Sequence, residues 1–142
     1  MGLETLFPEV DEDKRIFKLC DLVRETSFAI HKYHRNGHLE KVYENALLLE
    51  LRKLGLECMA RCPIEVFYDD VKVGFYIADI IVNDCVIIEV KAAEALCEEH
   101  EAQLTNYLRA TDIEVGILMN FGKKAEFKRK VFSAEYKNHK KS

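Results

Sequence analysis

The chain has 142 residues, of which 49% are hydrophobic and 32% charged, and its formal net charge is −4. This length and composition allow a buried core in a single domain and exclude an intrinsically disordered protein. The sequence has no long apolar run and no basic segment ahead of an apolar one at its start, so neither a membrane span nor a signal peptide is expected. We therefore expect a cytoplasmic protein with one domain over residues 1–142 and loose tails at 1–12 and 134–142.

Two helices are expected before the first strand. Residues 13–35 place apolar side chains at helical spacing, which predicts an amphipathic helix. Asn36 and Gly37 interrupt the pattern, and a second amphipathic helix is expected over residues 39–54. Both helices need a partner surface for their apolar faces.

The remaining residues predict a sheet with one further helix. β-Branched and aromatic residues dominate 56–67 and 71–82, and Asp69-Asp70 between them predicts the turn of a hairpin. The later elements are a strand at 85–90, a helix at 93–109, a buried strand at 113–121 and an optional edge strand at 126–132. This order indicates an α/β domain.

Charged residues interrupt the apolar pattern of two neighbouring strands. Alternation in 71–82 places Asp79 on an apolar face, and Glu89 shares a face with Lys91 on the next strand. Two carboxylates can hold a hard divalent cation, while a lysine orients water and offsets negative charge on a phosphate. An ion pair at the rim of a sheet explains the same residues, and both interpretations remain open.

The two carboxylates can share a site only in one register of the strands. Asp79 lies opposite Glu89 if Val82 pairs with Val86, because opposed residues of an antiparallel pair face the same side. A two-residue turn would place the two carboxylates on opposite faces. We therefore predict a three-residue loop over 83–85 or a nearby bulge.

Three ordered segments carry a resemblance to a known family. They read GHLEKVYENAL at 37–47, ADIIVNDCVIIEVKA at 78–92 and HEAQLTNYL at 100–108. The sequence resembles the GxxExxY proteins of the PD-(D/E)XK nuclease superfamily, and the third segment is similar to the QxxxY element of RecB-like exonucleases. The resemblance implies a restriction-endonuclease-like core, with a mixed central sheet and flanking helices in the order ααβββαβ and a further β strand.

The resemblance also implies a role for each residue that matches a motif. Mg²⁺ or Mn²⁺ would be bound by Asp79, Glu89 and Glu40, Lys91 would act on water and phosphate, and Gln103 and Tyr107 would position these groups. Helical spacing alone suits a solvated Glu40 and ordinary packing of Gln103 and Tyr107 equally well. No cysteine follows Cys97, so no iron-sulfur cluster is expected.

Other side chains could bind ions or phosphate. Cys58 and Cys62 lack a second pair to complete a zinc site, and His31, His34 and His38 suit the solvated end of a helix better than a metal site. Residues 120–142 carry eight Lys or Arg residues and two acidic ones. The candidate nucleic-acid-binding residues among them are Lys123, Lys124, Lys128, Arg129 and Lys130, although the same charges would also keep the chain in solution.

Two functions of different classes are consistent with this sequence. The first is a metal-dependent nuclease that hydrolyses phosphodiester bonds in nucleic acid, in DNA rather than RNA. The second is a catalytically weak or inactive module with a nuclease fold, which binds nucleic acid or has a regulatory role. Either could work as a homodimer through its first two helices or with an unidentified protein partner, and neither involves a membrane.

Overall fold

The computed structural model describes residues 2–133, and the tail predicted at 134–142 lies outside them. The helices are α1 (Leu3–Leu6), the 3-10 helix η1 (Glu12–Lys14), α2 (Arg15–His34), α3 (Glu40–Lys53) and α4 (Glu98–Arg109). The strands are β1 (Cys58–Tyr68), β2 (Val71–Val82), β3 (Val86–Lys91), β4 (Val115–Phe121) and β5 (Ala125–Val131). The α/β class and the additional edge strand are confirmed.

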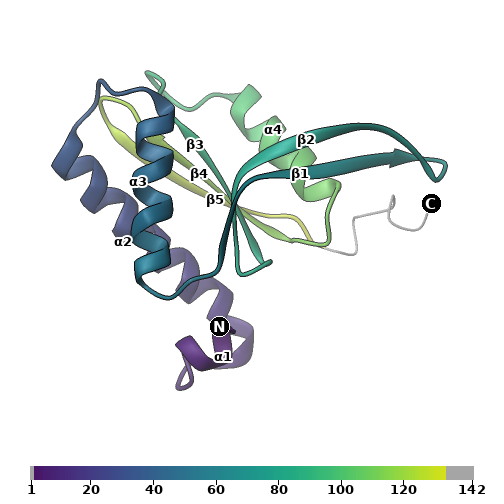
Figure 1. The fold of residues 1–142 in the computed structure, drawn as a ribbon, viewed down its shortest axis with the longest axis horizontal. Coiled ribbons are helices and arrows are strands. Elements are labelled where there is room, and N and C mark those ends of the chain that lie inside the picture. The colour runs from purple at the N-terminus through teal and green to yellow at the C-terminus, as the bar shows by residue number, and fades with distance from the viewer. Residues whose placement is uncertain (1, 134–142) are drawn as a thin grey trace.

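The five strands form one mixed sheet in the order β1-β2-β3-β4-β5. Strands β3 and β4 are parallel, and every other neighbouring pair is antiparallel. The connection through α4 carries the chain from the end of β3 back to the edge of the sheet at which β3 begins. β4 therefore starts beside the start of β3 and runs parallel to it. The mixed sheet with flanking helices that the resemblance implied is therefore present (Figure 1).

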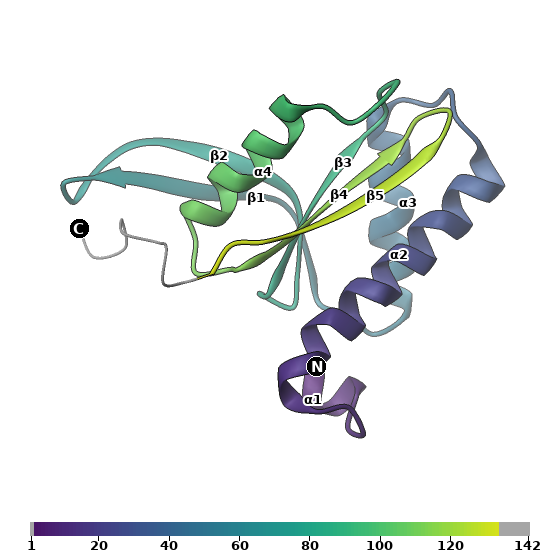
Figure 2. The ribbon, with the colours of Figure 1, turned by 180° about the vertical axis from the view of Figure 1, so that it is seen from behind.

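Helices cover both faces of the sheet (Figures 1 and 2). On one face, α2 and α3 pack through Leu47 and neighbouring apolar residues onto Ile88 and Ile117. On the other, α4 packs through Leu104 onto Ile87 and its neighbours. Within residues 2–133, no helix is long and apolar enough to span a membrane.

The predicted register between β2 and β3 is confirmed. Val82 pairs with Val86, so the connecting loop has three residues. Asn83 and Asp84 in this loop have φ angles of 48° and 55°, a conformation that Asn and Asp tolerate better than most residues. Because β3 pairs only with the last part of β2, the rest of the β1–β2 hairpin projects beyond the sheet (Figure 1).

The N-terminal segment, expected as a loose tail over 1–12, contains α1. Leu3 and Leu6 pack against the core on the α2 side of the sheet. Arg15 Nε donates hydrogen bonds to the carbonyl oxygens of Phe7 at 3.1 Å and Val10 at 2.9 Å. These contacts tie the segment to the start of α2.

Helix α4 begins five residues later than the sequence pattern predicted, at Glu98 instead of residue 93. The alanine-rich segment before it favours a helix by propensity. In the structure, the N–H groups of Ala93 and Leu96 bond instead to the side chains of Asn120 and Glu126. Contacts with distant residues therefore override the local preference.

The turn between α2 and α3 is fixed by Tyr43, which is fully buried. Its hydroxyl donates to the Arg35 carbonyl and accepts a bond from the His38 N–H at 3.2 Å. Its ring stacks on Phe121, with the ring centroids 4.7 Å apart. Gly37 provides the φ of 114° that this turn requires. The turn and the stacked ring set the orientation of α3 on the sheet.

Candidate active site

The side chains of Asp79 and Glu89 lie where β2 and β3 stop pairing. Regular pairing ends at Ile80 and Ile88. Beyond that point, the Asp79 N–H donates to Glu89 Oε2 at 2.9 Å, and the Val90 N–H donates to Asp79 Oδ2 at 2.8 Å. The carboxylates accept bonds that backbone carbonyls accept in a regular ladder, so they lie together between the separating strands.

Helix α3 adds a third carboxyl group to this pair. Glu44 is only 5% exposed, and its charge acts on both Asp79 and Glu89. Its Oε1 lies 3.3 Å from Lys41 Nζ, and its buried Oε2 has no donor group among the described residues, although the Glu44 carboxyl group interacts with that of Asp79 and so raises the pKa of Asp79. A buried carboxylate oxygen without a donor is costly, so this site suits a bound cation.

The role of Glu40 as a metal ligand stays a prediction. Glu40 is exposed at the first residue of α3, one helical turn before Glu44. The sequence did contain a signal for Glu44, because its helical spacing places it on the buried face with Leu47 and Leu51. A glutamate on the apolar face of a packed helix is a better candidate for a buried site than one at the helix start.

Helix α4 contributes from the other face of the sheet. Lys91 Nζ donates to Gln103 Oε1 at 2.8 Å, and Gln103 Nε2 donates to the Tyr107 hydroxyl at 3.0 Å. The ring of Tyr107 packs near that of Tyr76, with the centroids 5.1 Å apart. Since Gln103 uses its amide oxygen for Lys91 and its amide nitrogen for Tyr107, it holds both side chains at once.

Burial and the charges of neighbouring carboxyl groups raise the pKa values of Asp79 and Glu89. Burial, and then the charge of Asp79, raise the pKa of Glu89 to about 8, against the lowering effects of the Asp79 N–H and Lys91. Burial raises the pKa of Asp79 to about 6; Glu44 adds to this effect, while the Val90 N–H and Lys91 oppose it. Burial and the two carboxylates also raise the pKa of Tyr107 to about 12, which keeps its hydroxyl protonated.

The chemistry of these side chains fits a hard divalent cation. Oxygen ligands are those that Mg²⁺ and Mn²⁺ prefer, and a cation would offset the repulsion among the three carboxyl groups. Within residues 2–133, no three His, Cys, Asp or Glu side chains already form a metal-binding arrangement. One oxygen of Asp79 and one of Glu89 accept bonds from backbone N–H groups.

We expect the metal-free protein to lose stability as the pH rises from about 4 to 8. Since the folded-state pKa values of Asp79 and Glu89 lie above their ordinary values of 3.8 and 4.5, the folded protein retains protons that the unfolded chain has released. The decrease in the free energy of unfolding should be on the order of a few kcal/mol. Urea unfolding at several pH values, with EDTA present, measures it.

The matched comparison for this pH effect uses two glutamates. Glu89→Gln should flatten the decrease, because the amide carries no charge at any of these pH values. Glu65→Gln, at a side chain that is 54% exposed, should leave it unchanged. A stability that rises over the same pH range would contradict the raised pKa values.

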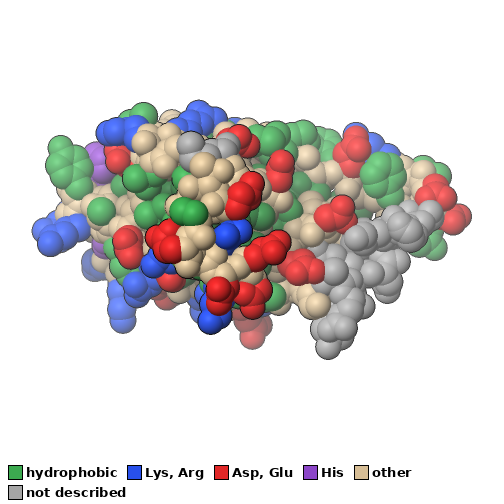
Figure 3. Space-filling model, turned by 90° about the horizontal axis from the view of Figure 1, so that it is seen from below, with side chains coloured by type: hydrophobic (Ala, Val, Ile, Leu, Met, Phe, Trp, Pro, Cys, Tyr) green, Lys and Arg blue, Asp and Glu red, His purple; other side chains and the backbone are tan. Residues whose placement is uncertain are grey.

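The five predicted nucleic-acid-binding residues do not form one patch. Lys128 and Lys130 bond to Glu101 at 2.6 Å and 3.3 Å, while the guanidinium of Arg129 lies 4.4 Å from the ring centroid of Phe17 on α2. Lys123 and Lys124 are exposed in the turn between β4 and β5. On the face shown in Figure 3, basic and acidic side chains are interspersed. The role of these residues in binding stays a prediction.

This fold and this site define a class, the restriction-endonuclease-like α/β proteins. The family model of the PD-(D/E)XK nuclease superfamily matches residues 18–130, and the chain belongs to this superfamily. The crystal structure of a protein named SSO0001 is similar over 66% of this chain and 50% of that one, with a TM-score of 0.53 and 20% identity. The chain thus spans half the length of that protein, and the likeness establishes the fold alone. No curated protein matches the sequence.

Proposed function

We propose that this protein is a metal-dependent nuclease of the GxxExxY type that hydrolyses phosphodiester bonds, in DNA rather than RNA. The observation that carries the proposal is the cluster of the buried Glu44 and Glu89 with the partly buried Asp79, in which the pKa values of Asp79 and Glu89 are raised and one oxygen of Glu44 has no hydrogen-bond donor among the described residues. Three carboxyl groups that lie together at a largely buried place repel one another when charged and call for a cation. Superfamily membership supports the same reaction.

The side chains divide the work between binding and positioning. Asp79, Glu89 and Glu44 would hold Mg²⁺ or Mn²⁺, which when bound supplies Lewis acidity and offsets the charge of the phosphate. The Lys91 ammonium would orient the attacking water and stabilise negative charge on the phosphate oxygens. Gln103 holds that ammonium in place, and the protonated Tyr107 keeps a hydroxyl hydrogen available for donation.

The alternative is a nucleic-acid-binding module with little or no turnover. It is favoured by the bonds from backbone N–H groups to one oxygen each of Asp79 and Glu89, since these engage oxygens that a metal ion would need. Titration of the wild type with Mg²⁺ and Mn²⁺ by calorimetry, beside cleavage assays on single- and double-stranded DNA and RNA, separates the two functions. Metal binding with metal-dependent cleavage supports the nuclease, metal binding without cleavage supports the module, and absence of metal binding excludes the proposed site.

We expect Glu44→Gln to weaken Mg²⁺ binding by about tenfold to a hundredfold, and Glu40→Gln to change it by about twofold or less. Glu44 is buried beside the carboxylate pair, whereas the exposed Glu40 acts through solvent. Calorimetry on the two matched variants measures the difference. A larger loss in Glu40→Gln than in Glu44→Gln would instead assign the acidic residue of α3 at the site to Glu40, as the resemblance implied.

Two further predictions concern the location of the protein in the cell and its assembly with other chains. A cytoplasmic location and a homodimer or unidentified protein partner stay predictions from the sequence. Sedimentation of the purified protein at several concentrations tests the homodimer.

A further inference from the structure

The segment between Lys91 and α4 is held by side chains of the β4–β5 hairpin. Asn120 pairs with Lys91 where β3 and β4 end. Its Oδ1 accepts a bond from the Ala93 N–H at 2.8 Å, and its Nδ2 donates to the Ala93 carbonyl at 3.0 Å. The amide of Asn120 thus continues the pairing beyond the last residue of β3.

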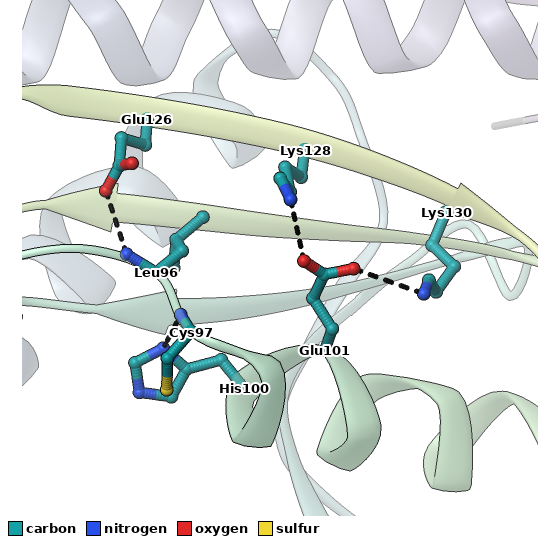
Figure 4. A network of polar contacts seen from close by, with 7 residues as sticks. All are labelled: Leu96, Cys97, His100, Glu101, Glu126, Lys128 and Lys130. Atoms are coloured by element: carbon teal, nitrogen blue, oxygen red, sulfur yellow. Dashed lines mark hydrogen bonds and ion pairs between the residues drawn. The ribbon is translucent and has the colours of Figure 1, made fainter.

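Glu126 on β5 adds a second side chain to this contact, and Asn120 and Glu126 together are called the bracket. Its Oε1 accepts bonds from Asn120 Nδ2 at 2.9 Å and from the Leu96 N–H at 3.0 Å (Figure 4 shows the second). These bonds hold the pKa of Glu126 below its ordinary value, so the carboxylate stays charged. Since Asn120 is fully buried, its amide depends on these partners, and a residue that reverses donor and acceptor there is costly.

The segment lies directly against the hairpin at Gly122. A Cβ atom at this position would come within 2.0 Å of the Ala93 carbonyl oxygen, so only glycine leaves room for the segment. The Gly122 carbonyl is itself bonded by His31 Nε2 at 2.7 Å, which fixes the hairpin to α2. Residues 93–96 are therefore seated on a rigid support.

Lys91 precedes this supported segment in the chain and Gln103 follows it, and Lys91 Nζ donates to Gln103 Oε1 at 2.8 Å. A second clamp at the start of α4 joins Glu101 to Lys128 and Lys130, but these side chains are partly exposed (Figure 4). The bracket is the stronger constraint, because Asn120 is fully buried and its amide makes three hydrogen bonds. We propose that Asn120 and Glu126 are positioning residues that place the Lys91 ammonium against Gln103; their effect on catalysis rests on the proposed function.

The first test uses nuclear magnetic resonance and needs no cleavage. Asn120→Asp replaces the Nδ2 donor with an oxygen that faces the Ala93 carbonyl and the Glu126 carboxylate. The side-chain amide signals of Gln103 should shift, and hydrogen exchange of the Ala93 N–H should accelerate by about tenfold or more. Unchanged Gln103 signals would overturn the proposal. Glu126→Ala, which removes the shared acceptor, decides the same question if Asn120→Asp does not fold.

The control for this test is Asn83→Asp, the same substitution in the loop at the other end of β3. The bond described for this side chain runs from the Glu57 N–H to Asn83 Oδ1 at 3.1 Å, and an aspartate keeps that acceptor. The Gln103 signals should match those of the wild type. Signals that move equally in both variants would indicate a general change of the fold and would overturn the specific role of Asn120.

The second test is a kinetic double-mutant cycle. Asn120→Asp should lower kcat by about tenfold or more with KM changed by about twofold or less, and it should have little effect in a Gln103→Ala background. If Asn120→Asp lowered kcat equally in the wild-type and Gln103→Ala backgrounds, the proposal would be overturned. A general destabilisation of the fold acts independently of Gln103, so its effect would be additive. If the wild type cleaves no substrate, the proposed function fails, and the resonance comparison alone decides on positioning.

Discussion

Asp79→Asn should abolish Mg²⁺ binding and lower kcat/KM by about a thousandfold or more, while it stabilises the metal-free fold. An amide oxygen can still accept the bond from the Val90 N–H, so the strands keep their connection. The substitution removes one of the three carboxyl groups that repel one another, and the pKa of Glu89 should fall because the charge of Asp79 helps to raise it. Calorimetry, cleavage assays and thermal unfolding with and without Mg²⁺ measure the three effects.

The matched control is Asp69→Asn in the exposed turn of the β1–β2 hairpin. It changes the net charge equally, and asparagine tolerates the φ of 55° found there. Metal binding, cleavage and the stabilisation by Mg²⁺ should all remain. If Asp79→Asn retained wild-type Mg²⁺ binding, the carboxylate pair would not be the metal site.

The sequence predicted those parts of the fold that depend on local pattern. Period-two alternation gave β2 its observed bounds, and the requirement that Asp79 face Glu89 gave the correct loop over 83–85. The start of α4 was wrong because propensity favours a helix from residue 93, whereas Asn120 and Glu126 bind the backbone of that segment. These contacts join residues nearly thirty positions apart, so no local sequence pattern predicts them.

The site was predictable to a similar extent. The spacing of Gln103 and Tyr107 placed both on one face of α4, and the structure joins them to Lys91. The place of Glu40 in the motif predicted it as the metal ligand on α3, but the burial of Glu44 favours Glu44 for this role. Burial depends on how α3 is seated by Tyr43 and Phe121, which lie far apart in the sequence. The single asparagine in the apolar run 115–121 was a local signal for a buried polar contact at the end of β4.

Lys91→Met should lower kcat by about a hundredfold to ten-thousandfold and leave Mg²⁺ binding in place, a combination that differs from the loss of both in Asp79→Asn. Methionine keeps the apolar stem but cannot donate to Gln103 or to a phosphate oxygen. Because the charge of Lys91 lowers the pKa values of Asp79 and Glu89, both should rise in the variant, so binding is best measured by calorimetry near pH 8.5. Lys72→Met, at a lysine that is half exposed on the hairpin, provides the control for loss of one positive charge.

The outcome for Lys91 separates the two interpretations that the sequence left open. If Lys91 only forms an ion pair at the rim of the sheet, Lys91→Met should reduce stability and leave kcat within about twofold of the wild type. If Lys91 acts on water and phosphate, kcat should fall while KM and the Mg²⁺ affinity change little, because the ammonium contributes mainly in the transition state. Loss of Mg²⁺ binding in this variant would contradict the division of roles between the lysine and the three carboxylates.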